Sequence, residues 1–229
     1  MDQQQILDAH PKLKAYKLVS IDSMPKLFRL NGSLDVEFIY SVDTFMLMMA
    51  EDQKTLDAIE YTTNSRLLEV GMKANSSISI SGGIMNIFSS GSKTIINGQT
   101  VTNHSFGDSK IVIGMPSIPD LELHGSGDIS SSAVSQDRVN LVVQGSGDAK
   151  LTGRCMTANL FVQGSGDINC KGLVAVESIA KVQGSGDISC YAETTVNATV
   201  QGSGDITVFG NPPLKNTHVQ GSGDIRILG

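Results

Sequence analysis

The C-terminal half of the chain alternates apolar and polar residues on both sides of a recurring tetrapeptide, Gly-Ser-Gly-Asp. An apolar residue stands two positions before the first glycine, and apolar residues alternate with polar ones again after the aspartate. A period of two is typical of β-strands that bury one face, whereas a helix would lose about 1 kcal/mol at each glycine. This half is therefore predicted to contain short strands joined at glycine corners.

The tetrapeptide occurs six times, with successive copies 18 to 20 residues apart. A fixed period near 20 indicates stacked structural units. Such a repeat is long enough for one circuit of two or three short strands, and each circuit would lie about 4.8 Å from the next. We therefore predict an all-β fold, a parallel β-helix (solenoid) with about 19 residues per coil.

Strict alternation through the corner would turn both glycines inward and leave columns of Gln, Ser and Asp on the outside. The missing side chains would let the wall bend there, and glycine can also adopt a positive φ if the corner requires one. We single out these corners as the candidate site residues, with a structural role. They are Gly125, Gly127, Asp128, Gly145, Gly147, Asp148, Gly164, Gly166, Asp167, Gly184, Gly186, Asp187, Gly202, Gly204, Asp205, Gly221, Gly223 and Asp224.

The first half of the chain is less regular. Residues 31–36 form a degenerate copy of the motif, with leucine in place of the second glycine, and predict an early coil. Good helix formers over 51–60 predict one short helix, followed by a strand over 67–72. The Ser-, Gly- and Asn-rich segment 75–114 predicts further irregular coils, with a looped insertion near 89–104.

These patterns divide one continuous domain into three parts. Residues 1–20 are an N-terminal extension, 21–115 are irregular coils with the helix and the insertion, and 116–229 are the regular coils. The N-terminal coils and the helix are expected to cap one end of the stack. We expect the other end to be covered by a segment that folds back or by a second subunit, which would make the protein a homo-oligomer, because open sheet edges invite pairing.

Charge and hydropathy limit the partners. The net charge is -6, and the chain has no Lys/Arg cluster of the kind that phosphate binding requires, so nucleic acid is not an expected partner. No apolar run approaches the roughly 20 residues of a transmembrane helix. The first 17 residues carry Asp2, Asp8 and three glutamines in place of the basic and apolar stretches of a secretory signal.

The three cysteines, Cys155, Cys170 and Cys190, lack the spacing of a zinc site. Cys170 and Cys190 fall on equivalent inward positions of adjacent coils. We expect reduced core thiols, with a disulfide between these two as the alternative. No cofactor and no metal site is predicted.

The repeated Asp admits several chemistries. Calcium-binding rolls use Gly-Gly-x-Gly-x-Asp once per nine residues, a different spacing. The motif lacks the Lys-Ser/Thr ending of a phosphate-binding loop. Polysaccharide enzymes built on β-helices use paired carboxylates, but repeats give identical environments and acid/base catalysis needs unlike ones. A structural role for the aspartates is favoured. Neighbouring aspartate charges in the column would repel one another by about 0.9 kcal/mol per pair in water, so amide donors, protonation or cations must offset this repulsion.

The Val-Gln-Gly-Ser-Gly-Asp-Ile repeats and the lead-in over 111–128 resemble the bacterial head GIN domain family of auto-transporter adhesins. The resemblance covers residues 20 to 229. It implies a β-solenoid at an extracytoplasmic location (periplasm, outer membrane or cell surface) and supplies no catalytic residue.

Together these features predict a non-enzymatic envelope or surface β-helix, an adhesin or binding scaffold that presents flat faces to a glycan or to an envelope or matrix protein. One alternative is a polysaccharide-active β-helix enzyme, a lyase or a hydrolase. A second alternative is a calcium-stabilised structural module.

Overall fold

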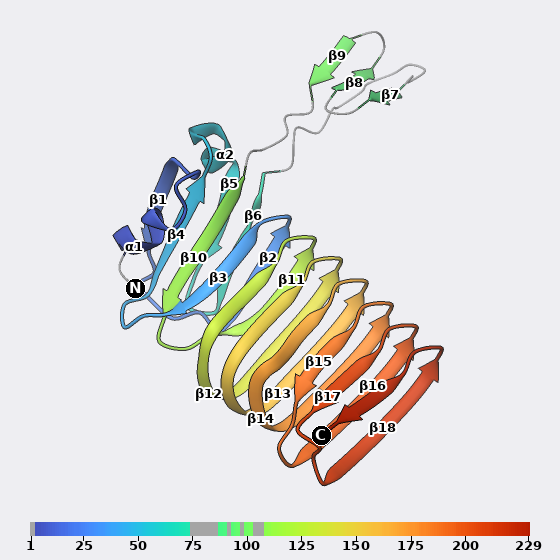
Figure 1. Cartoon of the computed structure of the whole chain (residues 1–229). Helices are drawn as coiled ribbons and strands as arrows, with labels where there is room; N and C mark the ends of the chain where they lie inside the picture. Colours follow the sequence, from blue (N-terminus) through green and yellow to red (C-terminus); the bar gives the residue numbers. More distant parts are fainter. Residues whose placement is uncertain (1–2, 74–86, 91–92, 97–98, 103–107) are drawn as a thin grey trace.

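The computed structural model describes residues 3–73, 87–90, 93–96, 99–102 and 108–229, and Figure 1 shows a solenoid of parallel coils. The fold is mostly β, with two short helices, and its principal sheet contains sixteen strands. The predicted parallel β-helix is therefore confirmed.

The regular coils run from the middle of the chain to its C-terminus. Each strand pairs in parallel with its equivalent in the next coil, and the register places motif on motif, with Gln144 opposite Gln163 and Gly145 opposite Gly164. The strands are β11 (Asp120–Gly125), β12 (Ile129–Gly145), β13 (Ala149–Gly164), β14 (Ile168–Gly184), β15 (Ile188–Tyr191), β16 (Thr195–Gly202), β17 (Ile206–Phe209), β18 (Leu214–Gly221) and β19 (Ile225–Leu228).

The N-terminal coils are stacked out of sequence order. Strand β2 (Leu27–Gly32) pairs in parallel with both β11 and β6 (Leu67–Met72). Strand β3 (Asp35–Tyr40) likewise pairs with both β12 and β10 (Ser109–Met115). The coil made by β2 and β3 therefore lies between a later coil, made by β6 and β10, and the regular array. The predicted early coil and the predicted strand over 67–72 are both present.

Antiparallel strands and a helix close the N-terminal end. Strand β4 (Phe45–Ala50) pairs with β10 and with β1 (Ala15–Ser20), and β5 (Ile59–Thr63) pairs with β6. The predicted short helix is α2 (Gln53–Ala58), which packs against β1, β4 and β5. Its N-cap is Asp52, whose Oδ1 accepts a 2.7 Å hydrogen bond from the Thr55 N–H. A second helix, α1 (Gln3–Asp8), buries Ile6 against Leu47, Met49 and Val112 on the outside of the sheet.

A separate antiparallel sheet joins β7 (Ile87–Ser90), β8 (Lys93–Ile96) and β9 (Gln99–Thr102), in the region where a looped insertion was predicted. Residues 74–86, where further irregular coils were predicted, lie outside the described residues.

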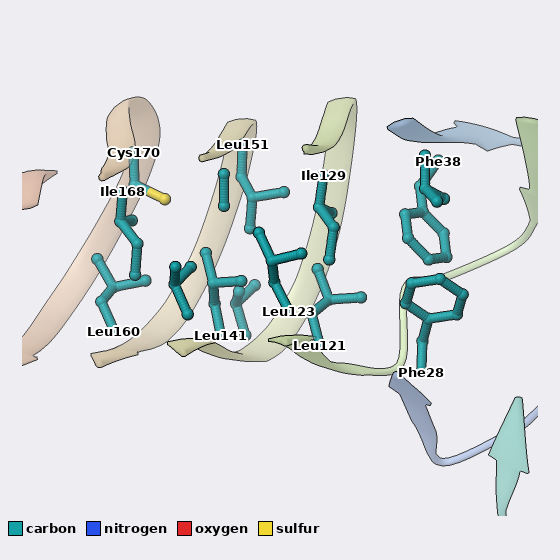
Figure 2. Packing of buried hydrophobic residues seen from close by; sticks show 14 of the residues in the cluster. Phe28, Phe38, Leu121, Leu123, Ile129, Leu141, Leu151, Leu160, Ile168 and Cys170 are labelled. Carbon is teal, nitrogen blue, oxygen red and sulfur yellow. The ribbon is translucent and has the colours of Figure 1, made fainter. Parts of the chain in front are cut away.

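The core consists of apolar columns that run along the inside of the solenoid (Figure 2). Phe28 and Phe38 meet edge to face at a centroid distance of 5.0 Å, and smaller aliphatic side chains fill the regular coils. Burying one such side chain contributes about 1.5 to 3 kcal/mol. Stacked copies therefore stabilise one another in a way that an isolated coil does not.

The C-terminal end of the solenoid is bare. Strand β18 is exposed along its whole length, and Val219 is 44% exposed where its counterpart Val200 is fully buried. No described segment folds back over it, so that part of the prediction is wrong; cover by a second subunit stays a prediction.

Lys215 and Thr217 stand at positions that Val196 and Ala198 fill in the preceding coil. A charged residue at an inward position of an edge strand discourages further pairing.

Candidate functional site

The first glycine of each corner has a backbone that other residues rarely adopt. Gly145 and Gly164 have φ angles of +139° and +142°, and the other first glycines have similar values. The carbonyl of Gly145 accepts hydrogen bonds of 2.8 and 3.0 Å from the N–H groups of Ser165 and Gly166 in the next coil. A Cβ on Gly164 would overlap that same carbonyl oxygen. The prediction of strict alternation is thus wrong at this position, because the positive φ turns the missing side chain toward the neighbouring coil.

The second glycine of each corner is buried and has no positive φ. A Cβ on Gly147 would overlap the carbonyl oxygen of Gly127, and the same holds at each later copy. Close stacking of two backbones therefore requires glycine here. In the degenerate copy this position is Leu34, which is buried, and a Cβ on Gly127 in the next coil would overlap its carbonyl oxygen.

The corner aspartates form a continuous ladder. In every step, Oδ1 of one aspartate accepts a hydrogen bond from the backbone N–H of its counterpart in the next coil. The steps run from Asp35 to Asp128 (3.2 Å), Asp148 (2.9 Å), Asp167 (2.9 Å), Asp187 (2.8 Å), Asp205 (2.7 Å) and Asp224 (2.8 Å). Amide donors thus provide the compensation that a column of carboxylates needs.

Two further polar ladders lie on the neighbouring face. Gln144 donates to Gln163 at 3.4 Å, and Gln183 donates to Gln201 at 2.7 Å. Asn159 Nδ2 donates to Asn140 Oδ1 at 2.6 Å, and Asn140 Nδ2 donates to Asp120 Oδ1 at 2.7 Å. These bonds add cohesion between coils without a ligand.

A groove of about 440 Å³ lies beside the aspartate ladder. It is lined by Asp35, Asp128, Asp148, Asp167, Lys110 and Lys150, among others. Desolvation raises the pKa of Asp35 above its usual value and the charge of Asp128 adds to this, while the Asp128 N–H and Lys110 oppose it. Lys110 also forms a 2.6 Å ion pair with Glu37. The described residues contain no cluster of three or more His, Cys, Asp or Glu side chains arranged to hold a metal ion.

A second groove, of about 530 Å³, lies on the face made by β11, β12, β13 and β14. Its floor contains Val142, Phe161 and Ile179, and Lys26 and Lys181 also line it. Our sequence reasoning missed these residues. Val142, Phe161 and Lys181 share one repeat position, and Ile179 lies two residues before it in its own coil. The copies differ at that shared position, three before the first glycine: Glu122, Val142, Phe161, Lys181, Thr199 and His218.

All three cysteines are buried free thiols. Burial raises the pKa of Cys155 to about 11 and the pKa values of Cys170 and Cys190 to about 12. Cys170 and Cys190 are directly opposed in the register, as expected, and serve as core residues.

Residues 27–212 match the family described as "Putative auto-transporter adhesin, head GIN domain". The chain belongs to this family. Among curated proteins nothing matches the chain significantly.

Solved structures from bacteria share the fold of this head GIN domain protein. One, described as a putative adhesin from Bacteroides fragilis, is 20% identical with a TM-score of 0.67, and the match covers 95% of this chain and 99% of that one. Another, described as a putative lipid binding protein from Parabacteroides distasonis, is 19% identical with a TM-score of 0.56, and the match covers 94% of this chain and 96% of that one.

In the described part of the chain, neither helix has the length and apolar character needed to cross a bilayer.

Proposed function

We propose that this head GIN domain protein is a non-enzymatic binding scaffold of the bacterial envelope or cell surface. Its long lateral faces hold an extended partner, a glycan or an envelope or matrix protein. The observation that supports this best is the aspartate ladder, in which every step repeats the same hydrogen bond. Acid/base catalysis requires neighbouring groups held in unlike environments, and a uniform ladder suits repetitive binding instead.

An extracytoplasmic location follows from the same proposal. The family description names an auto-transporter adhesin, and the solved structure from Bacteroides fragilis is also described as a putative adhesin. An adhesin meets its partner outside the cytoplasm, so we place this protein in the periplasm, at the outer membrane or on the cell surface.

A binding screen on immobilised glycans and matrix proteins tests the proposal. The wild type is compared with a variant that carries Asp148→Asn, Asp167→Asn and Asp187→Asn. Asparagine keeps an Oδ1 acceptor for the next coil, so the variant removes charge and preserves stacking. We expect saturable binding of the wild type to at least one class; absence of binding across the whole screen would count against the scaffold.

A polysaccharide-active enzyme is the second candidate, favoured by the groove in which Asp35 meets Asp128 and Lys110. Asp35, with its raised pKa, would be the acid there. Incubation with polysaccharides, followed by reducing-end and unsaturated-product assays, distinguishes the two. Depolymerisation by the wild type that is lost in Asp35→Asn would replace the binding scaffold with an enzyme.

A calcium-stabilised module is the third candidate. Thermal melting with calcium and with a chelator decides it, because a cation that binds only the folded state raises the melting temperature. An unchanged melting temperature removes this candidate.

A further inference from the structure

One outward column of the lateral face departs from its own pattern at a single coil. Five residues before the first glycine, the copies carry Asp120, Asn140, Asn159, Ile179, Asn197 and Asn216. The amide ladder is therefore interrupted only by Ile179, which is 40% exposed. At this partly exposed position isoleucine cannot make the amide hydrogen bonds that other members of the column make.

The neighbouring column is apolar in the two coils that precede Ile179, where it carries Val142 and Phe161. Val142 lies opposite Phe161 in the β12–β13 register, and Asn159 lies opposite Ile179 in the β13–β14 register. All of these side chains lie outside the core, since the inward positions between them belong to Leu141 and Leu160. An apolar surface rimmed by polar side chains is typical of a ligand site.

The acidic side chains of this groove are already engaged. Glu122 forms a 2.8 Å ion pair with Arg29, and Asp120 accepts the 2.7 Å hydrogen bond from Asn140. The charge of Glu122 is thus compensated by Arg29, whereas Asp120 is hydrogen-bonded by a neutral amide and keeps its charge.

The lysines of the groove are not compensated in this way. Neither Lys26 nor Lys181 has a carboxylate within ion-pair distance among the described residues. Lys181 Nζ lies 5.5 Å from the centroid of the Phe161 ring, which keeps its charge over the apolar floor. Of the lining side chains without an ion pair, Lys26 and Lys181 are positive and Asp120 is negative, so the unpaired charge that faces a ligand is net positive.

We infer that this groove binds an acidic polysaccharide through a uronate unit. The apolar face of a pyranose ring stacks on Phe161, its carboxylate contacts Lys181, and a hydroxyl donates to Asn159 Oδ1, since the Asn159 amide nitrogen is already directed to Asn140. Coils stacked about 4.8 Å apart present groups at a spacing near the length of one sugar, which suits a polymer lying along the solenoid. This inference rests on the proposed binding function and names its ligand class and site.

Binding of polygalacturonate to the intact protein, measured by calorimetry, tests the inference, with carboxyl-reduced polygalacturonate as the neutral probe. We expect the neutral polymer to bind at least about tenfold more weakly. Phe161→Ala should weaken polygalacturonate binding about tenfold, and Lys181→Gln should weaken it several-fold. Phe209→Ala and Lys171→Gln are matched controls outside both grooves and should leave binding unchanged; melting temperatures verify that each variant folds.

The outcomes separate this site from the broader proposal. Polygalacturonate binding that is indifferent to Phe161→Ala and Lys181→Gln overturns the site and leaves the binding scaffold standing. Equal affinity for the neutral and acidic polymers overturns the uronate class. Binding to matrix proteins alone in the screen above overturns the ligand class while the scaffold survives, and failure of every probe overturns both.

Discussion

The backbone N–H of Asp167 donates a 2.9 Å hydrogen bond to Oδ1 of Asp148, its counterpart in the preceding coil. The same bond joins each corner aspartate to the next, so that a column of like charges becomes a set of links between coils. Hydrogen bonds to an ionised acceptor are roughly twice as strong as neutral ones, and this offsets the repulsion along the column.

Replacing Asp148 tests this link. Asp148→Ala leaves the Asp167 N–H without its acceptor and should lower the free energy of unfolding by about 1 to 2 kcal/mol. Asp148→Asn retains an acceptor and removes one repulsive charge, so its loss should be much smaller. Urea unfolding of both variants measures the difference, and equal losses would show that the hydrogen bond contributes little.

A pair of glycine variants separates close stacking from backbone conformation. In Gly147→Ala the new Cβ would overlap the carbonyl oxygen of Gly127, which belongs to a rigid neighbouring coil, so we expect a loss of about 3 kcal/mol or more. Gly32 has φ +98°, and a Cβ added to it would meet no atom within 4 Å, so Gly32→Ala should cost about 1 to 2 kcal/mol. Denaturant unfolding of the two variants measures both losses. A larger loss for Gly32→Ala than for Gly147→Ala would show that φ strain matters more than close stacking.

The buried thiols predict a specific dependence on pH. Native protein at pH 8 should not react with a thiol reagent, whereas unfolded protein should react at Cys155, Cys170 and Cys190, because only the thiolate is nucleophilic. Between the usual thiol pKa of 9.0 and the native value of about 12, the unfolded state binds fewer protons than the native state. Stability should therefore fall as pH rises through this range.

Denaturation at pH 8 and pH 10, compared between the wild type and a Cys170→Ala, Cys190→Ala variant, isolates this contribution. The alkaline loss of stability should be smaller in the variant. Rapid labelling of the folded wild type, or a disulfide between these two cysteines, would contradict the assignment of core thiols.

The bare C-terminal coil predicts how self-association can be induced. The double variant Lys215→Val, Thr217→Ala restores the apolar inward pattern of β16 on the exposed edge strand β18. We expect it to scatter light as a larger species than the wild type at equal concentration. Lys150→Val, on a lateral face, is the matched control. No increase in mass for the double variant would show that Lys215 does not protect this edge.

The N-terminal order of the coils could not be predicted from the sequence. Residues 31–36 show that an early coil exists, yet nothing local indicates that β2 lies between β6 and β11. The coil made by β6 and β10 lacks the motif, so the repeat gives no register for it. Its place depends on pairing between segments far apart in the chain.

The residues of the groove around Phe161 are all in the sequence, but they do not form a recognisable motif. A repeat pattern records what the copies share. Val142 and Phe161 stand at a position where the copies share nothing, and Ile179 departs from a polar column. Only the register between coils brings these three residues from different coils to one place.

The sequence by itself determined the solenoid, its period and the glycine corners, because each of these depends on contacts between neighbouring copies about 19 residues apart, which repeat six times. The tertiary structure decided what is unique: the inserted coil at one end, the bare strand at the other, and the orientation of the first glycine in each corner. These depend on single long-range pairings and on backbone φ angles, and a repeating pattern of apolar and polar residues specifies neither.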